Sequence, residues 1–275
     1  RMRSIKLADI LGKKVDDDDI LKALAPQISL PPAIRGKILL SYAEYRLKKG
    51  SNSIPALGLN APWPDKFSAL YTGRSQVSGL SWIDTIANTT LYGYCPMCGS
   101  ETHKTVDHFL PRKPWAEFSF LSLNLVPSCG TCNGKRGNRA NAPHSPHRAL
   151  HPFYDHRLLK QRLHITKISP PYAAPKFEAD VCTSVSAKSR PRVTHHLDQS
   201  IDEVEYQQFC NNRWSELRQQ VRRTSTIAKW KKVIREHCDD AIATSGPNSW
   251  RTAFFDGILK NRDAVQWLFD NRAKA

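Results

Sequence analysis

The chain lacks any apolar run that is long enough to cross a membrane. Its apolar stretches, such as Ile38 to Leu40, are far shorter than the roughly 20 residues that span a bilayer. Internal repeats and low-complexity tracts are also missing, which argues against a solenoid or a low-complexity protein. Arg1 precedes Met2, so we take Met2 as the natural start, and no signal peptide follows it. We therefore expect a soluble, cytoplasmic protein with no membrane partner.

Acidic residues are scarce relative to basic ones. The chain has 41 lysines and arginines against 25 aspartates and glutamates, which gives a net charge of +16. The isoelectric point near 9.7 makes a nucleic acid a reasonable first partner to consider. A protein that needs its charge for solubility, or for an acidic protein partner, would have the same composition. Charge alone therefore favours DNA or RNA without deciding the function.

The N-terminal residues 1–66 predict helices followed by a loop. The acidic run from Asp16 to Asp19 is typical of a helix N-terminus. Pro31 and Pro32 suit the first turn of a second helix, which ends at Gly50 after two lysines. Residues 51–66 are rich in proline and lack periodicity, so they predict a loop or linker.

The C-terminal residues 157–275 predict a mainly helical region with a small β excursion. Alternating patterns predict strands at Leu163 to Ile168 and Lys176 to Val185, with a third at Val193 to Leu197. A capping box at Ser200 to Glu203 then predicts a long helix. Trp250 to Phe269 supply one or two terminal helices.

Seven cysteines, an odd number, do not form a disulfide framework, but four of them form two C-x-x-C pairs. Two such pairs offer four thiolates, which close a tetrahedron around zinc and leave no coordination position for a substrate. We therefore predict a structural Zn²⁺ that stabilises the fold and takes no part in chemistry. The predicted ligands are Cys95, Cys98, Cys129 and Cys132.

Between the two cysteine pairs lies the dipeptide Asp107-His108. A lone Asp-His pair is weak evidence for catalysis, because such a histidine is more often a satisfied structural residue. Its neighbours strengthen the case: Asn124 begins an Asn-Leu-Val strand, and the second cysteine pair runs directly into Asn133 and Lys135. A zinc-ribbon module without chemistry would give no reason for these side chains to occur together.

Taken in order, these residues resemble the HNH endonucleases with a ββα-metal fold, in the subgroup whose fold is stapled by a four-cysteine zinc site. The resemblance covers residues 92–139. It implies that Asp107 is the first ligand of a catalytic metal and that His108 is the general base. It also implies that Asn124 fixes the loop between the strands through hydrogen bonds to the backbone. Asn133 holds the final position of the motif, the second metal ligand, where many members of the family have histidine.

The asparagine at position 133, in place of the histidine of many family members, affects which catalytic metal we expect. An amide oxygen is a harder ligand than an imidazole, so we expect Mg²⁺ or Mn²⁺ at this position. The implied reaction is a one-metal hydrolysis in which His108 takes a proton from water, with a backbone carbonyl such as that of Val106 or Phe109 orienting the ring. Five nearby basic side chains are candidates for phosphate contacts, each equally well explained as solvated surface charge: Arg112, Lys113, Lys135, Arg136 and Arg139.

Two further segments have predicted roles. Residues Arg213 to Arg235 carry eight basic side chains and only Glu216 as an acid, so they are a candidate second surface along DNA, with an ordinary solvated helix face as the alternative. The segment from His151 to Asp155 is expected to dock the nuclease module onto the rest of the chain, and its histidine is not needed as a metal ligand.

Together these patterns predict an α+β protein in which a small zinc-stapled ββα-metal (HNH) module, within residues 67–156, is embedded in a mainly helical chain. The predicted activity is metal-dependent hydrolysis of DNA, as a nick or a double-strand cut. One such site cuts one strand, so a double-strand cut requires a homodimer or two successive events. An RNase or toxin on the same fold is the alternative enzyme. By analogy, small bacterial HNH proteins resemble phage-defence or restriction effectors that work with a partner ATPase or sensor.

Overall fold

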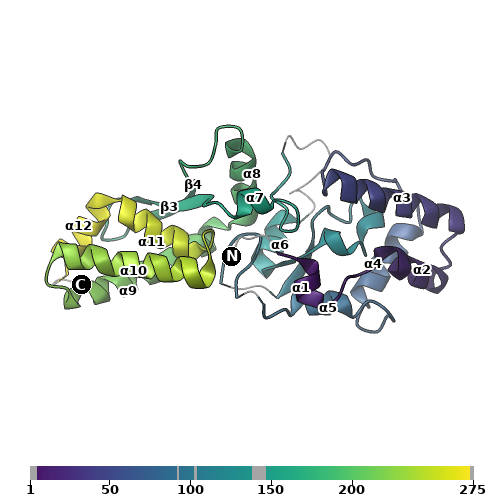
Figure 1. The fold of residues 1–275 in the computed structure, drawn as a ribbon, viewed down its shortest axis with the longest axis horizontal. Coiled ribbons are helices and arrows are strands. Elements are labelled where there is room, and N and C mark those ends of the chain that lie inside the picture. The colour runs from purple at the N-terminus through teal and green to yellow at the C-terminus, as the bar shows by residue number, and fades with distance from the viewer. Residues whose placement is uncertain (1–4, 92, 102–103, 138–146, 273–275) are drawn as a thin grey trace.

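The structure, a computed structural model, describes residues 5–91, 93–101, 104–137 and 147–272. These residues form a mixed α+β protein that is mostly helical and contains two small two-stranded sheets, so the predicted fold class is confirmed at this level. The molecule is elongated, with residues 17–72 toward one end of its long axis and residues 227–270 toward the other (Figure 1). Within the described ranges, no helix has the length and apolar character that a membrane span requires.

The described part of residues 5–159 forms what we call the N-terminal lobe. Asp16 caps the second helix by accepting hydrogen bonds from the backbone of Asp18 and Asp19, as the acidic run predicts. The predicted loop over residues 51–66 is correct up to residue 62, and a further helix begins at Trp63. The helices of the N-terminal lobe are α1 (Leu7–Leu11), α2 (Asp17–Ile28), α3 (Pro32–Lys48), α4 (Trp63–Thr72), α5 (Trp82–Ala87), α6 (Gly130–Arg136) and α7 (His156–Leu159).

At the centre of this lobe, two antiparallel strands are followed directly by a helix. Strands β1 (Thr105–His108) and β2 (Leu125–Ser128) pair with His108 opposite Leu125. The connection between them contains two 3₁₀ turns, η1 (Ala116–Phe118) and η2 (Ser122–Asn124). After β2, Cys129 caps α6, which packs against β1, while α5 packs against both strands. This strand–strand–helix unit carries the candidate site.

Residues 160–272 form the C-terminal lobe, in which helices pack against a β hairpin. Helix α11 crosses β3 so closely that a Cβ at Gly257 would lie 2.2 Å from the backbone oxygen of Thr166, so only glycine fits there. The elements of this lobe are β3 (His164–Ser169), β4 (Lys176–Val181), α8 (Arg190–Ser200), α9 (Glu203–Gln220), η3 (Val221–Arg223), α10 (Ile227–Ser245), α11 (Trp250–Lys260) and α12 (Arg262–Asp270).

Two local predictions in the C-terminal lobe are wrong. The segment from Val193 to Leu197 is part of helix α8 and not a third strand. Its buried residues include Val193, His196 and Ser200, which recur at intervals of three and four, as in a helix. In so short a segment this period is hard to distinguish from the alternation of a strand. The cap of α9 is Asp202, whose carboxylate accepts from two backbone N–H groups, whereas Ser200 ends α8.

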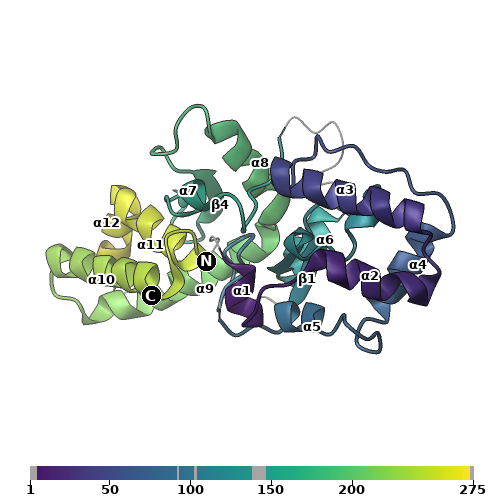
Figure 2. The ribbon, with the colours of Figure 1, turned by 45° about the vertical axis from the view of Figure 1, so that its right-hand side comes forward.

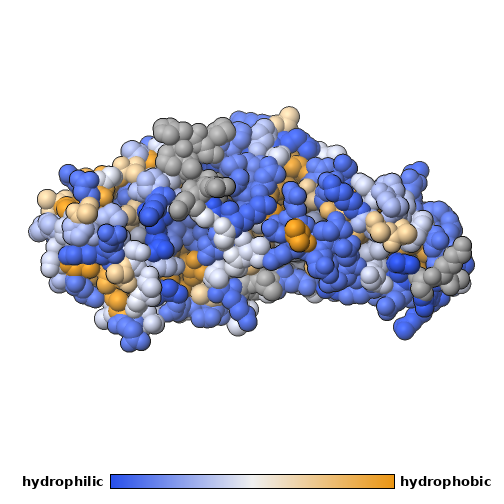
Figure 3. Space-filling view, turned by 180° about the vertical axis from the view of Figure 1, so that it is seen from behind, coloured by the Kyte–Doolittle hydropathy of each residue, from blue (hydrophilic) through white to orange (hydrophobic). Residues whose placement is uncertain are grey.

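The buried apolar side chains form one continuous cluster that extends through both lobes. On the face seen in Figure 3, the surface is mainly hydrophilic, and hydrophobic residues occur in small separate patches. The second ribbon view shows α2, α3 and α4 around the outside of the strand–strand–helix unit (Figure 2). The candidate site therefore lies in a frame built by helices that precede it by many residues in the sequence.

Candidate active site

The four predicted zinc ligands converge on one buried point. Their sulfur atoms all lie within 4.8 Å of one another, and the sulfurs of Cys98 and Cys129 are 3.6 Å apart. Four sulfurs at about 2.3 Å from a tetrahedral zinc ion lie about 3.8 Å apart, so this group fits the ion. The backbone N–H of Cys132 points at the sulfur of Cys129, and that of Cys129 points at the sulfur of Cys95. Such donors stabilise thiolates, the form in which cysteine binds a metal.

The first cysteine pair is also one of the places where the two lobes contact each other. His196 of α8 donates to the backbone oxygen of Met97 at 2.8 Å. Trp250 of α11 donates twice, through its indole to the oxygen of Cys98 at 2.8 Å and through its backbone N–H to the oxygen of Gly99 at 3.0 Å. Three consecutive carbonyls of the cysteine loop are therefore held by the C-terminal lobe.

His108, at the end of β1, has its ring fixed by the connection between the strands. Its Nε2 lies 3.1 Å from the backbone oxygen of Ser119, and its ring packs edge-on against Tyr71 at 4.5 Å between centres. Because a carbonyl oxygen only accepts, Nε2 carries the proton and Nδ1 keeps its lone pair. Burial, together with the positive charge of Arg112, lowers the pKa of His108 to about 3, so the ring is neutral near pH 7. The orienting carbonyl belongs to Ser119 and not to Val106 or Phe109.

Asp107 and Asn133 lie on the two elements that pack on each other, β1 and α6. The carboxylate of Asp107 accepts a 2.6 Å charge-assisted hydrogen bond from Nε of Arg136, and both side chains are buried. The amide nitrogen of Asn133 donates to the backbone oxygen of Val106 at 3.3 Å and to the hydroxyl of Thr105 at 3.4 Å. These bonds use the amide nitrogen and leave the amide oxygen for a ligand.

Asn124 fixes the connection between the strands, as the resemblance implies. Its amide accepts from the backbone N–H of Leu110 at 2.7 Å and donates to the oxygens of Leu110 and Phe118 at 3.0 and 3.2 Å. The hydroxyl of Tyr45, on α3, lies 3.1 Å from the Asn124 amide oxygen and 3.1 Å from Nε2 of His151. All these groups are buried, so Asn124 holds the loop that places Ser119 against His108.

The three residues predicted at the chemical centre line one cavity. This cavity has a volume of about 420 Å³, and Asp107, His108 and Asn133 share it with Arg112 and Lys113. Helix α4 forms part of its wall, together with Pro111, Ala116, Ser119 and Gly137. The structure therefore brings the carboxylates of Asp107 and Asp65, the amide of Asn133, one neutral imidazole and two cations into the same recess.

Helix α4 supplies contacts that sequence reasoning missed. The guanidinium of Arg112 hydrogen-bonds the hydroxyl of Ser68 at 3.3 Å and lies 4.9 Å from the centre of the Tyr71 ring. Arg74 lies over the same ring at 5.0 Å. Tyr71 thus contacts His108 and two arginines. Its position before the cysteine pairs gave no signal of this, because its proximity to the site arises only from the packing of α4 on η1.

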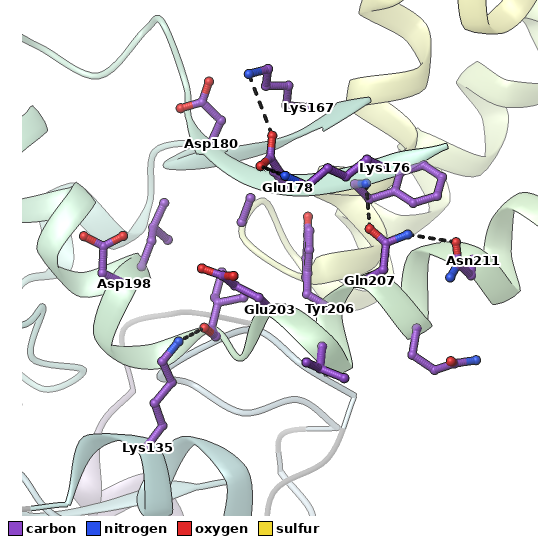
Figure 4. A pocket seen from close by; sticks show the side chains of 16 residues that line it. Lys135, Lys167, Lys176, Glu178, Asp180, Asp198, Glu203, Tyr206, Gln207 and Asn211 are labelled. Atoms are coloured by element: carbon purple, nitrogen blue, oxygen red, sulfur yellow. Dashed lines mark hydrogen bonds and ion pairs between the residues drawn. The ribbon is translucent and has the colours of Figure 1, made fainter. Parts of the chain in front are cut away.

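Two of the other predicted phosphate contacts, Lys135 and Arg136, do not line this cavity. Arg136 is buried against Asp107, so the prediction that it meets phosphates at the surface is wrong. Lys135 donates to the backbone oxygen of Ile201 and lines a separate cavity of about 620 Å³ beside β4 and α9 (Figure 4). Adjacent helix positions point to different faces, which explains why these neighbours diverge. Arg139 lies outside the described residues.

The basic segment from Arg213 to Arg235 occupies the end of α9, η3 and the start of α10. Two of its arginines contact the protein itself: Arg213 pairs with Glu216 at 2.8 Å, and Arg218 lies 5.6 Å from the ring centre of Trp267. The others are exposed, so a positive surface exists, and its use as a DNA contact stays a prediction. The exposed members are Arg222, Arg223, Lys229, Lys231, Lys232 and Arg235.

The segment from His151 to Asp155 connects the candidate site to helices α3 and α8, in agreement with its predicted docking role. His151 is buried with its ring 4.0 Å from that of Phe109 and contacts α3 through Tyr45. Asp155 forms ion pairs with Arg148 and with Arg192 of α8. This histidine is therefore a structural residue.

Comparison with known proteins gives little beyond this geometry. No family model matches the chain, and no solved structure matches it. The sequence is similar to Protein ea31 of Escherichia phage lambda, with 25% identity over 184 residues. The match covers 62% of this chain and 62% of the phage protein, so the chain spans less than two thirds of that relative's length.

Proposed function

We propose that the chain is a metal-dependent HNH-type endonuclease that hydrolyses phosphodiester bonds in DNA. The observation that carries this proposal is the convergence of Asp107, His108 and Asn133 on one cavity, beside Arg112 and Lys113. The cavity is formed on a strand–strand–helix unit held by four cysteines, in the order that the family resemblance requires. A zinc-binding module that only holds nucleic acid has no need for this set of side chains.

The donors in the cavity suit a small hard cation. The carboxylate of Asp107 and the amide oxygen of Asn133 are oxygen ligands, and Mg²⁺ typically takes one or two protein oxygens and completes its shell with waters and substrate phosphates. Arg136 occupies one carboxylate oxygen of Asp107, so the ion would bind the other. When bound, such an ion stabilises negative charge on the phosphate and on the leaving oxygen.

His108 is the group that takes the proton. Nε2 is held by the carbonyl of Ser119, so Nδ1 is the nitrogen with a lone pair available to accept a proton from the attacking water. Packing against Tyr71 restricts the ring to this orientation. Arg112, fixed by Ser68 and by the Tyr71 ring, is positioned to bind the phosphate that enters the same cavity.

Offering several substrates to the purified protein tests this function. We expect supercoiled plasmid to be nicked or linearised with Mg²⁺ or Mn²⁺ and to stay intact with a chelator of those ions present. Cleavage of single-stranded RNA with plasmid left intact would reassign the site to an RNase. Plasmid that is shifted in a gel but left uncut with both ions would favour a binding module and overturn the proposal.

A further inference from the structure

Helix α3 has apolar residues on two opposite faces. Its inner face buries Ile38, Tyr42 and Tyr45 in the core. Its outer face carries Leu40 and Leu47, which are 73% and 80% exposed. Apolar residues on all sides of a helix are typical of one that is covered on both sides, yet nothing in the described part of the chain covers these leucines. The helix runs along the outer edge of the N-terminal lobe (Figures 1 and 2).

The exposed side of α3 has a regular pattern. Gly36, Leu40, Ala43 and Leu47 are all exposed and follow one another at intervals of four, three and four residues. This is the spacing of the seam between two packed helices. A Cβ at Gly36 would have open space around it, so this position accepts the side chain of a neighbouring helix. We call these four residues the α3 seam.

We propose that the α3 seam binds the α3 seam of a second copy of this chain in an antiparallel, two-fold arrangement. A single register places Leu47 of each copy opposite Gly36 of the other, and Leu40 opposite Ala43. Each large side chain then faces a small one, which gives the self-complementary contact that a two-fold interface requires. A parallel pairing would instead place glycine against glycine and leave a gap.

The charges beside the seam fit the same register. Lys37 and Glu44 flank the seam on one side, seven residues apart, and both are accessible. In the antiparallel arrangement, Lys37 of each copy lies beside Glu44 of the other, which forms two ion pairs between copies. Glu44 also pairs with Lys48 of its own helix at 2.8 Å, whereas Lys37 has no ion pair among the described residues. Size and charge therefore favour the same partner and the same orientation.

The seam is short, so the dimer is expected to be weak. A few helical turns bury less area than a standard stable interface, and we expect a dissociation constant on the order of micromolar. The inner face of α3 contacts Asn124 through Tyr45, so the seam is separated from the candidate site by one helix. Two copies would bring two cutting sites into one assembly, although the pairing itself does not depend on any cutting activity.

Sedimentation equilibrium between about 1 and 100 µM tests the proposal. We expect the mass to rise with concentration from 31.2 kDa toward twice that value. Leu40→Lys, at an exposed position that tolerates it in the monomer, is expected to weaken the dimer by at least about a hundredfold, because the change occurs twice in the interface. Val204→Lys is the matched control, since Val204 is 78% exposed in the other lobe, and it should leave the dimer unchanged.

A charge swap tests the register. Lys37→Glu and Glu44→Lys should each weaken self-association by about tenfold, because each variant places like charges together twice. An equimolar mixture of the two variants restores both opposite-charge contacts, so its association should return to about the wild-type level. Wild-type protein that stays monomeric at 100 µM, Leu40→Lys that dimerises like wild type, or a mixture no tighter than either variant would each overturn the proposal.

Discussion

Replacing His108 with glutamine is expected to lower the rate of plasmid nicking by at least about a hundredfold, since general-base assistance typically contributes a hundred- to ten-thousand-fold. The glutamine amide can still donate to the carbonyl of Ser119 but cannot accept a proton from water at neutral pH. His108→Ala should reduce nicking by a similar factor, and it also leaves that buried carbonyl without its donor, at a cost of about 1 to 3 kcal/mol in unfolding free energy. Nicking rates, with thermal unfolding of each variant, measure both effects.

The matched control is His237→Ala. His237 lies on α10 in the other lobe and hydrogen-bonds Gln220 at 2.9 Å, so its loss should change nicking by less than about twofold. A His108→Gln protein that is folded and cuts plasmid at more than about a third of the wild-type rate would remove His108 from the chemistry.

Loss of the zinc site is expected to have the largest effect on stability. Zinc bound by four thiolates contributes roughly 10 to 16 kcal/mol in small peptides, which matches or exceeds the net stability of about 5 to 15 kcal/mol of a typical domain. Cys132→Ala should therefore abolish stoichiometric zinc and unfold the strand–strand–helix unit. Metal analysis should find one zinc per wild-type chain and none in the variant.

The joint between the lobes makes the zinc effect visible by a second measurement. Because Met97, Cys98 and Gly99 present their carbonyls to His196 and Trp250, a disordered cysteine loop should also loosen the contact between the two lobes. Limited proteolysis should then cut between the lobes in zinc-depleted protein and not in the loaded protein. Cys238 is a buried cysteine of α10 outside the four-cysteine cluster, so the Cys238→Ala protein should still bind one zinc per chain. Zinc-free protein that melts at the wild-type temperature would contradict a structural role for the metal.

Sequence alone predicted the parts of the site that depend on local spacing. The two C-x-x-C pairs predicted the cysteine cluster because a short turn between the cysteines of each pair presents both thiolates to one ion. The role of Asn124 in fixing the connection between the strands was implied by the family resemblance, and its hydrogen bonds to Leu110 and Phe118 agree with it. Helices with clear caps, such as the one that begins after Asp16, were likewise predictable.

The parts that depend on long-range packing were not predictable. Ser119 reaches His108 only because the connection folds into η1, and Tyr71 reaches it only because α4 packs on that turn. Lys135 contacts Ile201 in the C-terminal lobe, whereas Arg136 is buried against Asp107. Which of the two faces β1 depends on the rotation of α6 about its axis, and a single sequence does not specify that rotation. The basic composition was informative about charge, but it did not distinguish a cation in the cavity from a cation that neutralises a buried carboxylate.

The dependence of nicking on Mn²⁺ concentration tests most directly whether Asp107, His108 and Asn133 act as one site. Asn133→Ala removes an oxygen ligand, so we predict that it raises the half-saturating Mn²⁺ concentration by at least about tenfold. His108→Gln should lower the maximal rate and leave that concentration nearly unchanged, because the imidazole moves a proton and does not bind the ion. An Asn133→Ala protein with the wild-type rate and the wild-type Mn²⁺ dependence would contradict the proposed metal centre.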